Sequence, residues 1–183
     1  MGTYILPFAE PDAKIRLMFE DEASFGRINE PSSCWAPGGV RPIVPCQIVR
    51  EYVQVYGAVD PISGDSCFII APSCDTACMN IFLSELSKQL GKDYALLCLD
   101  NAPWHKSKDL FIPENIRLFY LPPRTPEMNV IEQFWPEVRK DGFKNTLYET
   151  LSDVIDKLCV SLKLVDCSLV ISITGRNWIA KMF

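Results

Sequence analysis

The sequence predicts a mixed α/β fold in which one sheet is covered by helices. Three strand-like segments follow one another between residues 15 and 70, separated by turn sequences. Two nearly continuous apolar runs, Tyr94–Leu99 and Ile116–Leu121, have the composition of strands that are buried on both faces. Helical periodicity lies between and after these runs. A meander joined to strands that alternate with helices indicates a mixed sheet.

The first strand is predicted over Ile15–Phe19 and is expected to end in a run of acidic residues. Strict alternation assigns its side chains to two faces. One face carries Leu17, Phe19 and Asp21, and the other carries Arg16, Met18, Glu20 and Glu22. Asp21 is therefore expected at the end of a strand, where ligands of α/β sheets collect.

Two further strands complete the meander. A long strand is predicted over Gln47–Val59, and the sequence Asp60–Gly64 is typical of a turn before a third strand at Ser66–Ile70.

Helices are predicted from caps and spacing. Asp75 is a suitable N-cap for a helix that Gly91 closes, with apolar residues at helical spacing between them. A short helix is expected after Asp100, and two longer helical segments cover about 130–143 and 147–164.

Composition indicates one globular domain over residues 1–183. The chain is 48% hydrophobic, which is enough for a single core, and no apolar run is long enough to span a bilayer. No basic head precedes the first apolar stretch, so no secretion signal is expected and the predicted compartment is the cytoplasm. The net charge of −5 argues against a protein that coats DNA by itself.

The eight cysteines are expected to be reduced thiols. Cys67, Cys98 and Cys159 lie in apolar runs, where cysteine is an ordinary small hydrophobe. A zinc site is disfavoured because the tightest pair is Cys74 and Cys78 and the chain has a single histidine.

Three acids lie at element boundaries near the expected cleft: Asp21, Asp100 and Glu132. Carboxylates gathered at one point repel one another unless a cation joins them, and hard oxygen ligands suit Mg²⁺ or Mn²⁺. Two such ions about 4 Å apart support in-line phosphoryl displacement. The pattern therefore favours nuclease or strand-transfer chemistry.

Each acid also has a structural interpretation. Asp21 could end a strand in solvent, and Asp100 could cap the helix that follows it. Asn129 with Glu132 three residues later is a capping-box pattern, which the spacing alone favours. Pro136 cannot donate a hydrogen bond to the carbonyl of Glu132, so the helix should bend there or remain in its opening turns.

Three blocks of sequence resemble the catalytic motifs of the IS630 family of bacterial transposases, within the Tc1/mariner superfamily. They are Phe19–Phe25 (FEDEASF), Leu99–Ser107 (LDNAPWHKS) and Leu121–Trp135 (LPPRTPEMNVIEQFW). This sequence has Asn-Val-Ile-Glu and Pro-Arg-Thr-Pro where the family has Asn-Pro-Ile-Glu and Pro-Tyr-Ser-Pro, and a slightly shorter gap from Asp100 to Glu132. The second and third blocks together are the specific ones.

The resemblance implies an RNase H-like fold: a mixed five-stranded sheet, with a three-strand antiparallel meander and two parallel strands, flanked by helices. It also implies that Asp21, Asp100 and Glu132 bind two Mg²⁺ ions, for which Mn²⁺ substitutes. Such enzymes hydrolyse DNA at transposon ends and then attack target DNA with the freed 3′-hydroxyl. DNA, a homodimeric assembly on DNA and a separate helix-turn-helix segment are the expected partners, since this sequence lacks the family's N-terminal helix-turn-helix region.

Other residues of these blocks have two interpretations each. Asn101, His105, Lys106 and Arg124 are candidate substrate contacts. His105 could instead be a local hydrogen-bonding group that orients the Asp100 loop, and Lys106, Lys108 and Arg124 could belong to a mixed solvated surface. Trp135, one helical turn after Glu132, is expected in the core rather than stacked on DNA.

Two rival functions remain open from the sequence. One is an RNase H-like nuclease or resolvase without strand transfer. The other is an inactive remnant that only binds DNA or a protein partner.

Overall fold

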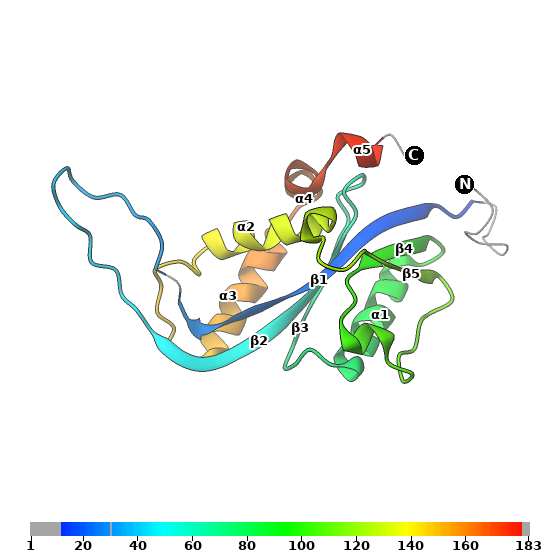
Figure 1. Ribbon diagram of the computed structural model, residues 1–183, viewed down its shortest axis with the longest axis horizontal. Helices are drawn as coiled ribbons and strands as arrows, with labels where there is room; N and C mark the ends of the chain where they lie inside the picture. The colour runs from blue at the N-terminus through cyan, green and yellow to red at the C-terminus, as the bar shows by residue number, and fades with distance from the viewer. Residues whose placement is uncertain (1–11, 30, 181–183) are drawn as a thin grey trace.

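The structure is a computed structural model that describes residues 12–29 and 31–180 (Figure 1). The N-terminal segment on which the expectation about a secretion signal rests lies outside these residues. Among the described residues, no helix is long and apolar enough to cross a membrane.

Five strands form one mixed sheet, as predicted. They are β1 (Ile15–Ile28), β2 (Ile48–Val59), β3 (Ser66–Ala71), β4 (Tyr94–Leu99) and β5 (Ile116–Tyr120). Their order in the sheet is β3-β2-β1-β4-β5. β1 pairs antiparallel with β2, and β2 antiparallel with β3, which gives the predicted meander. β1 pairs parallel with β4, and β4 parallel with β5.

The prediction that the first strand ends at the acidic run is wrong, because β1 continues to Ile28. Its apolar alternation resumes after the acids with the buried residues Ala23 and Phe25. Pairing with β4 stops at Phe19, whereas pairing with β2 continues through Asp21, which faces Gly57. Asp21 therefore lies where β1 separates from β4, inside a strand and at the edge of a gap in the sheet.

The helices cover both faces of the sheet (Figure 1). α1 (Thr76–Leu90) packs on the face that includes Met18, and Asp75 caps it by accepting a hydrogen bond from the backbone of Cys78, as predicted. The opposite face, which includes Leu17 and Phe19, packs against α2 (Phe134–Lys140), α3 (Leu151–Lys163), α4 (Cys167–Thr174) and α5 (Asn177–Ala180). The two faces of β1 match the predicted alternation.

The predicted helix over 130–143 is divided in two. Val130–Gln133 forms a short 3-10 turn, η3, and α2 begins at Phe134. Pro136 thus lies in the opening turn of α2, where its missing N–H leaves no helical bond unmade, as expected. Two more 3-10 turns, η1 (Pro103–Lys106) and η2 (Pro126–Met128), follow β4 and β5. α3 starts later than predicted, and α4 and α5 were not predicted.

Segment 31–47, between β1 and β2, extends away from the sheet (Figure 1). Its base is closed by Asn29, whose side chain donates to the carbonyl of Pro45 and accepts from the backbone of Gln47. Trp35 and Ile43 in this segment are almost fully exposed. The loop therefore presents apolar side chains outside the core.

Gly57 allows two aromatic rings to lie directly on β2. A Cβ atom at this position would be 2.7 Å from Trp135 Cη2 and 2.8 Å from Phe68 Cε1, closer than packed atoms approach. Because Gly57 faces Asp21 across the strand pair, this packing also determines where Trp135 lies relative to that acid.

Gly57→Ala is expected to lower the melting temperature. Overpacking costs about 1–3 kcal/mol, which corresponds to roughly 3–10 °C for a chain of this size. Thermal denaturation followed by circular dichroism measures it. Gly38→Ala is the matched control, since nothing lies within 4 Å of its added Cβ. Equal melting temperatures for the two variants would show that the aromatic packing on Gly57 is loose.

Candidate active site

Asp21 and Asp100 are brought together by neighbouring parallel strands. Phe19 in β1 pairs with Cys98 in β4, and each acid comes two residues later. Asp21 is largely buried, whereas 60% of the Asp100 side chain is exposed. The two carboxylates therefore occupy the inner and outer sides of the gap between β1 and β4.

Glu132 approaches the same gap from η3. It lines one cavity of about 340 Å³ together with Asp100, and a neighbouring cavity of about 420 Å³ together with Asp21. The structure thus gathers the three predicted acids around one point, with Glu132 between the other two.

The electrostatics of the acids reflect this proximity. Burial and then the negative charge of Glu132 raise the pKa of Asp21 to about 7. Burial and then the charge of Asp100 raise the pKa of Glu132 above its ordinary value. Both shifts have the sign expected for carboxylates that are buried beside other acids.

Trp135 holds the Asp21 carboxylate in place. Its indole Nε1 donates to Asp21 Oδ2 at 2.8 Å, and the side chain is only 4% exposed. The expectation that Trp135 belongs to the core is confirmed. The contact with Asp21 was not predicted from the sequence. The position of Trp135 one helical turn after Glu132 could have indicated that it lies near the acids.

The capping-box interpretation of Glu132 is wrong. Asn129 makes no side-chain cap; its amide instead donates to the backbone carbonyl of Glu20 at 2.8 Å. This bond reaches across to β1 and fixes η3 beside it. The Asn129 side chain therefore makes a tertiary hydrogen bond in place of a helix cap, and Glu132 faces the cavity.

Asp100 shapes the turn that follows β4. Its Oδ1 accepts from the backbone of Ala102 at 2.8 Å and lies 3.0 Å from His105 Nδ1. The N-cap position of η1 is Ala102 rather than Asp100, so the helix-cap interpretation is also wrong. The acid is oriented by its own loop.

The other candidate substrate contacts differ in where they lie relative to the cavity of Asp100 and Glu132. Asn101 and Arg124 line the cavity of Asp100 and Glu132, and Asn101 donates to the carbonyl of Leu121 at 2.6 Å, joining the loops after β4 and β5. Lys106 is exposed beside the ring of Tyr120, outside that cavity lining. His105 is 1% exposed, which favours orientation of the Asp100 loop over contact with a phosphate.

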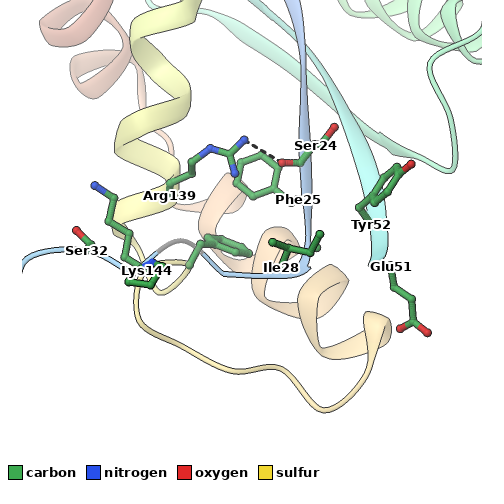
Figure 2. Close-up of a pocket in the computed structure, with 11 residues that line it drawn as sticks. Ser24, Phe25, Ile28, Ser32, Glu51, Tyr52, Arg139 and Lys144 are labelled. Atoms are coloured by element: carbon green, nitrogen blue, oxygen red, sulfur yellow. Dashed lines mark hydrogen bonds between the residues drawn. The ribbon is translucent and has the colours of Figure 1, made fainter. Parts of the chain in front are cut away.

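A third cavity, of about 480 Å³, lies farther along β1 (Figure 2). It shares Ser24 and Arg139 with the cavity of Asp21 and Glu132. Arg139 donates to the carbonyl of Ser24 at 2.9 Å and lies over the ring of Phe25, and Lys144 stands at the rim. Arg139 and Lys144 thus line a cavity that adjoins the cavity of Asp21 and Glu132.

The sheet order and the helices on both of its faces form an RNase H-like fold of the kind found in the catalytic cores of transposases and integrases. The chain belongs to the DDE superfamily endonucleases, whose family model matches residues 16–155. An uncharacterized protein of Sinorhizobium fredii, y4pE/y4sA, is 35% identical over 130 residues, which are 69% of this chain and 96% of that protein.

Solved structures agree on the fold. A Mos1 transposase paired-end complex matches with a TM-score of 0.66 and 13% identity over 87% of this chain and 51% of the Mos1 chain. An intasome of simian T-cell lymphotropic virus matches with a TM-score of 0.53 and 16% identity, over 82% of this chain and 48% of that chain. The chain therefore spans about half the length of these structural relatives.

In metal-free protein, Asp21→Asn is expected to stabilise the fold above pH 7. The folded pKa of about 7 exceeds the ordinary value of 3.8, so this group's stabilising contribution is complete below about pH 4 and is lost as the pH rises through 7. Asparagine still accepts from Trp135 and carries no charge. In EDTA, we expect a melting temperature roughly 5 °C above wild type at pH 8 and no difference at pH 4.

The control is Asp109→Asn, an exposed acid outside the site. If Asp21→Asn were less stable than wild type at pH 8, the charge of Asp21 would not be unfavourable in the folded protein.

Proposed function

We propose that this chain is the catalytic domain of a DNA transposase of the IS630 type within the Tc1/mariner superfamily. The proposed reaction is hydrolysis of phosphodiester bonds at transposon ends, followed by transfer of the freed 3′-hydroxyl into target DNA. The observation that carries it is the meeting of Asp21, Asp100 and Glu132, from three distant parts of the sequence, at the point where β1 and β4 separate.

The donor set fits a pair of hard cations. Burial and neighbouring acids raise the pKa of Asp21 and of Glu132, and a bound cation would reverse these shifts. Carboxylate oxygens of this kind suit Mg²⁺ or Mn²⁺. When bound, two such ions would neutralise the acids and polarise the phosphodiester. Mos1 complexes have been solved with Mn and with Mg, which supports the same assignment here.

The protein's own contribution is to hold the acids still. Trp135 orients Asp21, and the Ala102 backbone and His105 orient Asp100. The hydrogen bond from Asn129 to β1 holds η3, which carries Glu132, beside the strand. Such preorganised side chains keep the reacting groups aligned without a rearrangement during the reaction.

DNA is the proposed partner, as it is for the Mos1 paired-end and strand transfer complexes. Arg124, Arg139 and Lys144 border the cavities and are the proposed phosphate contacts, with Lys106 outside them. Because the net charge is −5, recognition of transposon ends is assigned to a separate helix-turn-helix segment. A homodimer on DNA would cover the exposed Trp35 and Ile43 of segment 31–47.

Loss of any one of the three acids is expected to reduce cleavage by at least about 1000-fold, because each substitution removes a charged ligand of the two metal ions. The variants are Asp21→Asn, Asp100→Asn and Glu132→Gln. The measurement uses labelled duplex ends and a supercoiled target, with Mg²⁺ or Mn²⁺, and scores cutting and joining separately. Asp109→Asn should match wild type.

The products also distinguish the rivals. Cutting without joining by the wild-type protein would favour a nuclease or resolvase. Absence of Mn²⁺ binding in calorimetry, with Asp100→Ala equal to wild type in DNA binding, would favour an inactive remnant.

Arg124→Ala is expected to weaken binding of a short duplex by about three- to tenfold and to lower the salt dependence of binding by about one ion, as loss of one phosphate contact requires. Fluorescence anisotropy at several NaCl concentrations measures both. Lys92→Ala, an exposed cation at the opposite end of β4, is the control. An unchanged salt slope for Arg124→Ala would place Arg124 outside the DNA path.

A further inference from the structure

A second group of acids lies on the other face of β1 from Asp21. Glu20 and Glu22 point toward the α1 side of the sheet and meet His105 from η1. The side chains of Glu20 and His105 are 0% exposed, and that of Glu22 is 8% exposed. His105 Nε2 lies 3.2 Å from Glu22 Oε1 and 3.6 Å from Glu20 Oε2. We refer to these three residues as the Glu20–Glu22–His105 cluster.

The surroundings of His105 fix which ring nitrogen faces the acids. Nδ1 lies 3.0 Å from Asp100 Oδ1 and 3.4 Å from the Asp100 carbonyl, both of which are hydrogen-bond acceptors. A proton on Nδ1 satisfies this side of the ring. In the neutral ring, Nε2 then presents a lone pair to two carboxylates, and three acceptors face one another without a donor between them.

Glu20 is the side chain that these contacts leave unsatisfied. Trp104 Nε1 already donates to Glu22 Oε1 at 2.6 Å. Neither carboxyl oxygen of Glu20 accepts a hydrogen bond from any residue that the structure describes, although both are buried. A proton on His105 Nε2 would serve Glu22 and still leave Glu20 without a partner. Burying a carboxylate in that state is costly, and a cation that contacts all three residues would remove this cost.

We propose that Glu20, Glu22 and His105 bind one Zn²⁺ ion, at a site separate from the ions assigned to Asp21, Asp100 and Glu132. The donor atoms all lie within 4.8 Å of one another. The distances from His105 Nε2 to Glu22 Oε1 and to Glu20 Oε2 bracket the roughly 3.3 Å edge of a tetrahedron with zinc bonds near 2.0–2.1 Å. Two carboxylates balance the charge of the ion.

The contact between His105 and Asp100 fits the same assignment. A histidine that binds a metal through one ring nitrogen regularly donates its other N–H to a carboxylate or carbonyl, which fixes the ring. Here that acceptor is Asp100. The zinc ion would therefore hold η1 against β1 and, through His105, the loop that carries Asp100. The proposal does not depend on transposase activity.

The test uses the single histidine of the chain. Protein produced without a histidine tag, with ¹⁵N-labelled histidine, is titrated with Zn²⁺ and followed by nuclear magnetic resonance. The background variant Asp21→Asn with Glu132→Gln removes carboxylates of the other site and leaves Asp100 beside His105. We expect about one Zn²⁺ per chain, a shift of the Nε2 resonance to that of a metal-bound nitrogen, and a protonated Nδ1.

Glu20→Gln in the same background keeps the side-chain shape and should weaken Zn²⁺ binding by at least about 10- to 100-fold, with loss of the Nε2 shift. Glu85→Gln, an exposed acid on α1, is the matched control and should bind like the background. In the unaltered chain, chelation of zinc should lower the melting temperature, which tests the site without any substitution.

Three results would overturn the proposal. One is an Nε2 resonance that does not respond to Zn²⁺ in the unaltered chain. Another is zinc bound with the same affinity in Glu20→Gln, which would assign the metal to cysteine thiols. The third is a Glu20→Gln variant that is more stable than wild type while neither binds zinc, which would show that Glu20 is held as a neutral acid.

Discussion

Repulsion among carboxylates is the constraint on which this structure depends. Glu20, Asp21 and Glu22 are consecutive in β1, and Asp100 and Glu132 approach the same part of the strand. Burial and the neighbouring acids raise the pKa of Glu20 well above its ordinary value, and the pKa of Asp21 also rises. Both shifts show that the fold holds several acids closer together than carboxylates would remain if all of them were charged.

Alternation along β1 divides these charges between its two faces. Asp21 faces α2, and the indole of Trp135 in that helix donates to it. Glu22 lies on the other face of the strand, and the indole of Trp104 in η1 donates to it. Each tryptophan closes one face of the strand with a ring and supplies one N–H to a carboxylate. The same residues therefore pack against the core and orient the acids.

The site differs between its inner and outer parts. Asp21 is largely buried and lines one open cavity with Glu132 and Arg139, whereas the mostly exposed Asp100 lines the other with Glu132 and Arg124. The acids of this DDE superfamily endonuclease are therefore reached from open cavities at the separation of β1 from β4.

Local sequence determined the five strands, α1 and the three acids to consider, but neither the division of the helix over 130–143 nor α4 and α5. The alternation of β1, the cap at Asp75 and the apolar run of β4 each depend on neighbours in the chain, so periodicity and cap chemistry were sufficient. The end of β1 could not be predicted, since its acids are buried by partners more than 80 residues away, such as Trp104 and Trp135. Likewise, only the tertiary structure turned Asn129 from a helix cap into a bond to β1 and placed His105 between Asp100 and two buried glutamates. Hydrogen bonds of this kind join residues that have no sequence relation, and folding alone decides which donor reaches which acceptor.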